Sequence, residues 1–208
     1  MAYIVDYSYI NQSNLSFGTS SFKSEITEND LVENNFLTAI YRKQNYSYPK
    51  FFKMDNLSKI GFLNAELLLS HFPEVENRKN AGVICFNRIS SLTTDKNFEN
   101  TIIDSNNYYP SPALFVYTLP NIETGEICIR HKFMGESSFY VTEHFNSKYI
   151  ADIVEDSLKF NDIILSGWSD FVNSQIKSLM FLVSKDKSED SELFDSQNIE
   201  KIFKSLFL

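Results

Sequence analysis

Glutamate and histidine stand next to each other at Glu143 and His144, where a short apolar segment gives way to a helical pattern. Ser137–Val141 has the composition of a short strand, and a helix is expected to start near Asn146. A helix N-terminus carries partial positive charge, so it favours a carboxylate such as Glu143 and keeps a histidine such as His144 neutral. We interpret Glu143 and His144 as a packed or interfacial pair without chemistry, and ligand binding and catalysis are the alternatives.

The other histidines and the serines form no second constellation of this kind. His131 sits beside Arg130 and Lys132 at the expected end of a helix, where basic side chains complement the helix dipole. The histidines show neither HxxH nor HExxH spacing, so no metal site is expected, and no GxGxxG or Walker loop indicates a cofactor. Ser137 and Ser138 lack the glycine pattern of a nucleophile elbow.

Composition bounds the class of protein. The two cysteines, Cys85 and Cys128, lie inside apolar patterns without CxxC spacing, and we interpret them as reduced core residues of a cytoplasmic protein. No signal peptide is apparent, and no apolar run approaches the roughly 18 residues that a membrane span needs. A net charge of −8 argues against nucleic acid as a partner, because phosphates need clustered Lys and Arg.

One stretch is densely basic although the chain is acidic overall. Its members are Arg42, Lys43, Lys50, Lys53 and Lys59. A solvated face is one interpretation of these charges, and a docking surface for an acidic carrier protein is the other.

Strand and helix patterns alternate along the chain. Apolar runs predict strands at Tyr3–Ile10, Ala81–Phe86, Ser137–Val141, Ile163–Leu165 and Ser178–Ser184. Helical spacing predicts helices over about 30–41, 54–69 and 120–135, from Asn146 onward and near 199–206. Residues 11–23 are expected to be loop, whereas a turn at 167–170 is what the family resemblance described below implies. With 208 residues, this alternation predicts one layered α/β domain with a mainly parallel sheet.

Three short segments carry a resemblance to a known family. They are Thr118-Leu119-Pro120-Asn121, Gly135-Glu136-Ser137-Ser138 and Thr142-Glu143-His144. In this order they resemble the β-ketoacyl synthases of the thiolase-like superfamily, in which Thr-x-x-Asn, Gly-Pro-Ser and Thr-Ala-Cys follow one another. The cysteine of the last motif carries the acyl group in that family. Here His144 stands at its place, or Glu143 if the register slips by one.

The resemblance, which covers about 54–182, implies the N-terminal half of a thiolase-like fold, with residues 1–208 as a single domain. That half has a five-stranded, mainly parallel mixed sheet, an antiparallel last strand and helices on both faces. The family also needs two histidines and a lysine from its C-terminal half, and this chain ends before that half. It therefore resembles a catalytically degenerate synthase, and its activity as an enzyme is in doubt.

The role implied is that of a non-enzymatic partner, comparable to a chain length factor, in bacterial fatty-acyl, polyketide or aryl-polyene biosynthesis. The alternatives are a decarboxylase or hydrolase acting on a carrier-bound substrate, or a stand-alone acyl-binding module. Expected partners are a second copy or a full-length synthase, and an acyl carrier protein. The expected dimer interface is the strand containing Ser137, Phe139, Tyr140 and Val141. The expected acyl-binding residues are Tyr108, Phe115, Tyr117 and Asn121.

Overall fold

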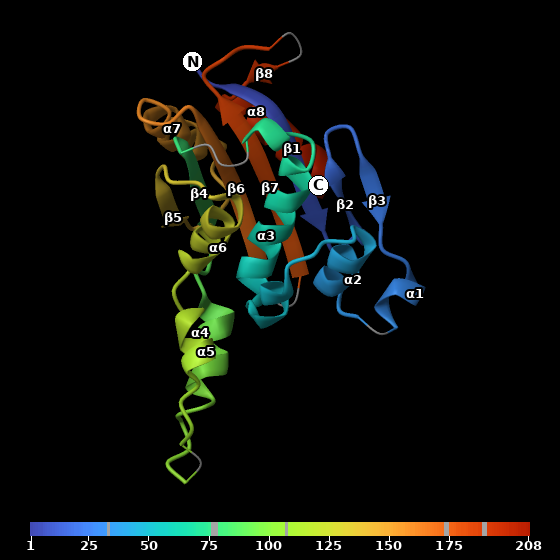
Figure 1. Ribbon diagram of the computed structural model, residues 1–208, viewed down its shortest axis with the longest axis vertical. Coiled ribbons are helices and arrows are strands. Elements are labelled where there is room, and N and C mark those ends of the chain that lie inside the picture. The colour runs from blue at the N-terminus through green and yellow to red at the C-terminus, as the bar shows by residue number, and fades with distance from the viewer. Residues whose placement is uncertain (33, 76–78, 107, 173–174, 189–190) are drawn as a thin grey trace.

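A mixed β-sheet with helices on both faces organises the chain (Figure 1). The computed structural model describes residues 1–32, 34–75, 79–106, 108–172, 175–188 and 191–208. No helix within these ranges is long and apolar enough to cross a membrane.

The described part of the sheet has eight strands. They are β1 (Tyr3–Asn11), β2 (Ser16–Thr19), β3 (Lys23–Glu25), β4 (Ala81–Asn87), β5 (Ser137–Val141), β6 (Ile163–Val172), β7 (Gln175–Ser184) and β8 (Glu192–Leu193). Their order is β3-β2-β1-β7-β6-β4-β5, and β8 pairs with β1 on the edge that β1 also offers to β2. β5 therefore forms one outer edge of the described sheet.

The strands β5-β4-β6-β7-β1 keep the arrangement that the family resemblance implied. β4 pairs in parallel with both β5 and β6, whereas β7 lies antiparallel between β6 and β1. Four of these five strands thus point the same way and the last one in sequence is reversed, which confirms the predicted mixed sheet. The predicted number of strands, five, was too low. β2 and β3 extend the sheet beyond β1, and β8 forms a further short pair with β1.

Two segments predicted as loop and turn are strands. Residues 11–23 form most of a hairpin in which Phe17 is fully buried, and a Cβ on Gly18 would lie 1.9 Å from the carbonyl oxygen of Phe22. The bare glycine backbone is what permits this close approach. Residues 167–170 continue β6, with Gly167 opposite Met180 and Trp168 opposite Leu179. Tertiary pairing with β7 therefore overrides the turn signal of a single glycine.

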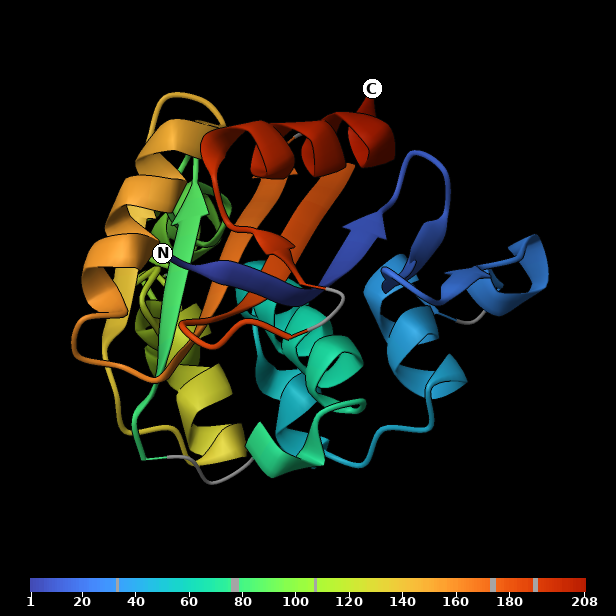
Figure 2. The same ribbon diagram turned by 90° about the horizontal axis from the view of Figure 1, so that it is seen from above.

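Helices divide between the two faces of the sheet (Figure 2). They are α1 (Glu28–Leu31), α2 (Phe36–Lys43), α3 (Asn56–Leu69), α4 (Leu92–Glu99), α5 (Pro112–Val116), α6 (Ile122–His131), α7 (Ser147–Ser157) and α8 (Ser196–Phe207), with 3₁₀ segments at Pro49–Lys53 and Pro73–Val75. α3 packs on β1, β6 and β7, and α6 packs on β4 beside α3. α7 and α8 pack against each other and cover the opposite face.

Local capping explains where the central helices begin. Asp55 caps α3 by accepting a hydrogen bond from the Ser58 amide at 2.9 Å. α3 is buried almost all round, as expected for a helix without a polar face. Asn146 caps α7 by accepting from the Tyr149 amide at 3.0 Å, which confirms the predicted start near Asn146.

The boundaries of α6 differ from the prediction. The helix begins at Ile122 rather than at Thr118 or Pro120, and Lys132 ends it in a left-handed conformation, with φ 56°. Gly135 has another role, because its amide donates to the Ala81 carbonyl at 3.0 Å and a Cβ there would lie 2.6 Å from that oxygen. The glycine thus lets the chain pass close to β4 before β5 begins.

The predicted helix over 30–41 is divided into α1 and α2. Asn35 caps α2 by accepting from the Thr38 amide at 3.0 Å. The segment around Phe98, for which no helix was predicted, forms α4. α4 and α5 contact each other through Phe98 and Phe115, whose ring centroids are 5.5 Å apart, and with the chain between them they form an arm that extends away from the sheet (Figure 1).

Candidate functional site

The candidate site lies where the parallel strands β4, β5 and β6 end. In open α/β sheets ligands bind in the crevice beyond the carboxyl ends of parallel strands. Asn87 ends β4 and is followed by Arg88, while the connection after Val141 leads through His144 into α7. Trp168 and Asp170 lie in the last part of β6, two positions apart, so they share one face of the sheet.

Both residues that the sequence placed at this edge are exposed on the connection between β5 and α7. Of the two, His144 lines a pocket of about 220 Å³ and Glu143 does not. The backbone carbonyl of His144 accepts from the Thr142 hydroxyl at 3.0 Å. Neither residue caps α7, because Asn146 takes that position.

The pocket beside His144 is lined by charged and aromatic side chains. They are Arg88, His144, Phe145, Trp168, Asp170, Lys177 and Phe203. They come from the ends of β4, β5 and β6, from β7 and from α8, so no single segment of the sequence contains the site. Only His144 among them was predicted as a site residue.

One ion pair fixes the floor of this pocket. Nε of Arg88 lies 2.7 Å from Oδ2 of Asp170, and the Asp170 side chain is mostly buried. Lys177 stands directly opposite Asp170 in the β6–β7 ladder, but its ammonium group donates to the Phe207 carbonyl at 3.3 Å. Arg88 therefore neutralises Asp170, and Lys177 leaves the pocket with a surplus positive charge.

Three aromatic rings form the apolar side of the pocket. Phe145 stacks on Phe203 of α8, with centroids 3.8 Å apart and planes inclined by 14°. Phe145 also meets Trp168 edge-on at 5.5 Å. These contacts hold the chain after β5 against α8, and such aromatic pairs contribute beyond the area that they bury.

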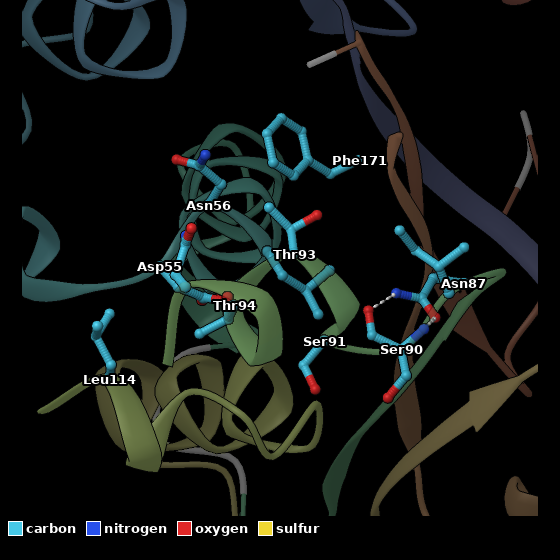
Figure 3. Close-up of a pocket in the computed structure, with 12 residues that line it drawn as sticks. Asp55, Asn56, Asn87, Ser90, Ser91, Thr93, Thr94, Leu114 and Phe171 are labelled. Carbon is cyan, nitrogen blue, oxygen red and sulfur yellow. Dashed lines mark hydrogen bonds between the residues drawn. The ribbon is translucent and has the colours of Figure 1, made fainter. Parts of the chain in front are cut away.

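A second pocket, of about 160 Å³, lies near the same strand ends and is lined mainly by short polar side chains (Figure 3). Thr94 donates to Oδ2 of Asp55 at 2.7 Å, so the start of α4 is tied to the cap of α3. Asn87 and Ser90 exchange two hydrogen bonds of 2.8 Å each, one of which Figure 3 shows. These hydrogen bonds tie together the segments that line the pocket.

A buried carboxylate that the sequence gave no reason to single out lies inside the layer formed by α3 and α6. Glu123 is 0% exposed, and neither of its carboxyl oxygens meets hydrogen-bond geometry with a described residue. Burial raises the pKa of Glu123 to about 8, with a further rise from Asp55, whereas the nearby Ser169 hydroxyl lowers it. A Cβ on Gly61 would lie 2.4 Å from Oε1 of Glu123, so the bare glycine makes room for this carboxyl group.

A second acidic side chain in the same layer is well paired. Oε1 and Oε2 of Glu66 accept from Arg130 at 2.7 and 3.0 Å, and Nε2 of His131 lies 3.2 Å from Oε1. Burial alone would raise the pKa of Glu66, but the contacts with His131 and Arg130 outweigh it and hold the pKa below its usual value. His131 is thus a buried partner of Glu66 rather than an exposed residue that complements the dipole of α6.

The four predicted acyl-binding residues do not meet in one place. Tyr117 is buried in the core beneath α3, and its hydroxyl donates to Glu126 at 3.2 Å. Phe115 and Tyr108 are exposed on the arm, at 55% and 59%. Asn121 is exposed where α6 begins and makes no capping hydrogen bond through its side chain. The spacing of apolar residues in the sequence did not distinguish the buried Tyr117 from the exposed Tyr108 and Phe115.

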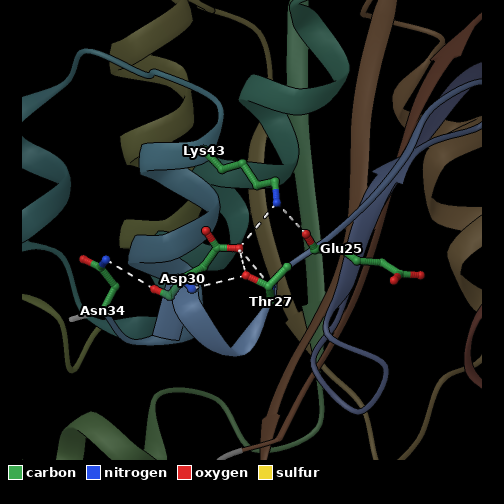
Figure 4. A network of polar contacts seen from close by, with 5 residues as sticks. All are labelled: Glu25, Thr27, Asp30, Asn34 and Lys43. Carbon is green, nitrogen blue, oxygen red and sulfur yellow. Dashed lines mark hydrogen bonds and ion pairs between the residues drawn. The ribbon is translucent and has the colours of Figure 1, made fainter. Parts of the chain in front are cut away.

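Two of the five predicted basic residues make ion pairs with acidic side chains. Lys43 lies 3.4 Å from Asp30 and donates to the Glu25 carbonyl at 2.8 Å, in a network that also contains Thr27 (Figure 4). Lys50 lies 2.8 Å from Glu126. Lys59 lies over the ring of Phe51, with its ammonium nitrogen 5.5 Å from the ring centroid. This arrangement favours the solvated-face interpretation of the stretch.

The edge strand β5 keeps one side of its backbone unpaired in the described sheet. The Thr142 amide donates to Asn87 and the Val83 amide donates to Glu136, which fixes the parallel register. The amides of even-numbered residues therefore face β4, and those of Ser137, Phe139 and Val141 face outward. Tyr140 stacks on Phe86 with centroids 5.2 Å apart, while Val141 is 53% exposed.

Cys85 is fully buried in β4, as predicted, and Cys128 is partly buried in α6; neither is in a disulfide. Burial raises the pKa of both thiols. Within the described ranges, no group of three or more His, Cys, Asp or Glu side chains is arranged to hold a metal ion.

Comparison with known proteins identifies the fold. No family model and no curated protein matches the sequence. Among solved structures, the ishigamide ketosynthase/chain length factor is similar with a TM-score of 0.66 and 11% identity, over 91% of this chain and 63% of that one. A ketosynthase (ApeO) in complex with its chain length factor (ApeC) from Xenorhabdus doucetiae is similar with a TM-score of 0.57 and 12% identity, over 99% of this chain and 92% of that one.

A third similar structure is AntDE:AntF, a type II PKS acyl-carrier protein in complex with its ketosynthase bound to the hexaketide. Its TM-score is 0.56 at 11% identity, over 97% of this chain and 64% of that one. This chain thus spans a little under two thirds of the length of two of the three similar chains. The likeness shows that the chain has the thiolase-like fold of the ketosynthases, as the resemblance implied.

Proposed function

We propose that this thiolase-like chain is a single-domain, non-catalytic partner of a ketosynthase, comparable to a chain length factor, in fatty-acyl, polyketide or aryl-polyene biosynthesis in the cytoplasm. The fold supports this role, because solved ketosynthase and chain length factor complexes share it. The free cysteines are in keeping with a reducing compartment. An acyl carrier protein is the second partner that such a role implies.

The observation that carries the proposal is an unpaired edge with apolar surface around it. β5 offers one row of backbone groups to a further strand, and unprotected edges of this kind pair readily with other chains. Most of the exposed large apolar side chains lie between residues 92 and 160. On the arm and the segments next to β5 they are Ile103, Tyr108, Tyr109, Phe115, Val116, Leu119, Ile129, Met134 and Val141. Of these, Val141 lies on β5 itself and Ile129 lies on α6, which packs beside β5, so apolar surface adjoins the unpaired edge.

The chemistry of the site supports a role without acyl transfer. The chain has two cysteines, and neither lies between β5 and α7, where His144 stands instead. An acyl-carrying thiol must be accessible and partly ionised, but Cys85 is fully buried and its pKa is raised. The position after β5 therefore offers an imidazole where the family resemblance implies an acyl-carrying thiol.

A first prediction follows for acylation. Incubation with an activated acyl thioester should leave the intact mass of the protein unchanged, because burial raises the pKa of both thiols and no cysteine stands between β5 and α7. A synthase with its cysteine intact, treated in parallel, supplies the positive control. A stoichiometric acyl adduct located on Cys85, Cys128 or His144 by peptide mass spectrometry would refute the non-catalytic role.

A second prediction concerns pairing through β5. Light scattering coupled to size exclusion should show a dimer at micromolar concentration, either of two copies or with the full-length ketosynthase of the same genome. Val141→Pro removes an outward-facing amide and leaves the ladder to β4 intact, so we expect it to weaken pairing at least tenfold, about 1.4 kcal/mol.

Val141→Thr is the matched control, because it keeps both the amide and the branched side chain, and it should pair like the wild type. Circular dichroism should show that both variants fold. A wild type that stays monomeric at high concentration, with and without the ketosynthase, would contradict the proposal. So would undiminished pairing of Val141→Pro.

A further inference from the structure

The pocket beside His144 has an excess of positive charge in an otherwise acidic protein. The lining contains Arg88, Lys177 and His144 but only one acidic group, Asp170. Asp170 already holds Nε of Arg88 at 2.7 Å, which leaves the terminal nitrogens of the guanidinium without a partner among the described residues. Lys177 makes one hydrogen bond, to the Phe207 carbonyl, and an ammonium group can donate three.

Lys177 and His144, unlike Arg88, have no acidic partner among the described residues of the lining. Lys177 makes no ion pair with any described acid, although Asp170 stands opposite it in the ladder. The His144 ring makes no hydrogen bond to a described side chain, and its ring faces the same pocket. A planar carboxylate suits this set, because a guanidinium binds carboxylate oxygens in a fixed fork geometry and an ammonium group adds a point charge.

The opposite side of the pocket is aromatic. Phe145 contacts both Trp168 and Phe203, and the stacked pair of Phe145 and Phe203 joins the segment after β5 to α8. A pocket of about 220 Å³ has many times the room that one water molecule needs. A ligand that combines an anionic group with a flat apolar body would contact both sides at once.

We propose that the pocket formed by Arg88, His144, Lys177 and the three aromatic rings binds a small aromatic carboxylate. The carboxylate lies against Arg88 and Lys177, and the ring lies against Phe145, Trp168 and Phe203. Binding is non-covalent and requires no partner chain, so this inference stands or falls separately from pairing through β5.

The protein carries its own probe for the test. Trp168 is the only tryptophan in the chain and it lines the pocket, so intrinsic fluorescence reports on this site. Titration with benzoate should give a saturable change in Trp168 emission. Benzamide, which has the same ring without the charge, and inorganic phosphate, which has charge without a ring, should each bind at least tenfold more weakly.

Two variants locate the binding. Lys177→Gln should weaken benzoate binding at least tenfold. Lys204→Gln, which removes a lysine from the exposed side of α8, should change it less than twofold. The double variant Arg88→Gln, Asp170→Asn removes the ion pair without leaving a bare buried charge, and it should also weaken benzoate at least tenfold. The monomeric Val141→Pro variant should bind benzoate like the wild type.

Absence of a saturable signal at high benzoate concentration would overturn the proposal. Equal affinity for benzamide and benzoate would show that Arg88 and Lys177 do not bind the carboxylate. Equal affinity for phosphate and benzoate would show that the aromatic rings of the pocket do not contact the ligand. Unchanged binding by folded Lys177→Gln protein would also overturn it.

Discussion

The free energy of unfolding should fall by up to about 5 kcal/mol as the pH rises from about 4.5 to about 8, because of Glu123. In the unfolded chain this carboxyl group ionises near its usual pKa of 4.5, whereas burial holds the folded value near 8. Between the two pH values the folded state binds one proton more than the unfolded state. Its contribution is therefore fully present below pH 4.5 and is lost as the pH rises through 8.

Glu123→Gln tests this directly. An amide is nearly isosteric with the protonated acid but does not ionise. In urea denaturation at a series of pH values, the free energy of unfolding of Glu123→Gln should therefore fall less steeply between pH of about 4.5 and about 8 than that of the wild type. Glu155→Gln, at an exposed position on α7, is the control and should leave the slope unchanged. Parallel pH profiles for wild type and Glu123→Gln would show that the carboxyl group is solvated in solution.

Glu66→Ala should lower the free energy of unfolding by about 3 kcal/mol at neutral pH. The change leaves Arg130 and His131 without the carboxylate that joins α3 to α6, and breaking a buried pair costs about 3–5 kcal/mol. The low end of that range applies because the Arg130 side chain is 33% exposed.

Thermal or urea unfolding of Glu66→Ala against Glu200→Ala measures the effect. Glu200 forms an exposed i,i+4 pair with Lys204, which is worth at most about 0.5 kcal/mol. The contribution of Glu66 to the free energy of unfolding depends on pH in the opposite direction to that of Glu123. The Glu66 pKa is lowered in the folded state, so its contribution is present above the unfolded pKa of 4.5 and is lost as the pH falls through the folded value. Equal losses in the two variants would contradict the buried pair.

Periodicity and short motifs predicted the central architecture. The continuous apolar run Ala81–Phe86 is β4, and the helices predicted over 54–69 and from Asn146 onward are α3 and α7. The hairpin of β2 and β3 was missed because its polar composition resembles a loop, and only contact with β1 shows which side chains are buried. Strand pairing of this kind depends on distant residues and leaves little local trace.

The candidate site was less predictable than the fold. His144 was singled out through one aligned motif, but Arg88, Lys177 and Phe203 join it only because three separate segments meet there. A usable signal existed in β6, where Trp168 and Asp170 are two residues apart. Interpreting that segment as a turn concealed their common face. Glu123 had no signal, because a glutamate in a helix is usually solvated.

The position of β7 between β1 and β6 constrains how the chain can be made on the ribosome. Tyr3 pairs with Ser184 and Asn11 pairs with Lys177, so β1 can pair with β7 only after about 170 further residues have been synthesised. Until then the inner edges of β1 and β6 are unpaired, and chains with such non-local pairing fold slowly and are exposed to aggregation. Nascent chains that stop before β7 should therefore depend on chaperones, and the sheet should be completed only after β7 has left the ribosome.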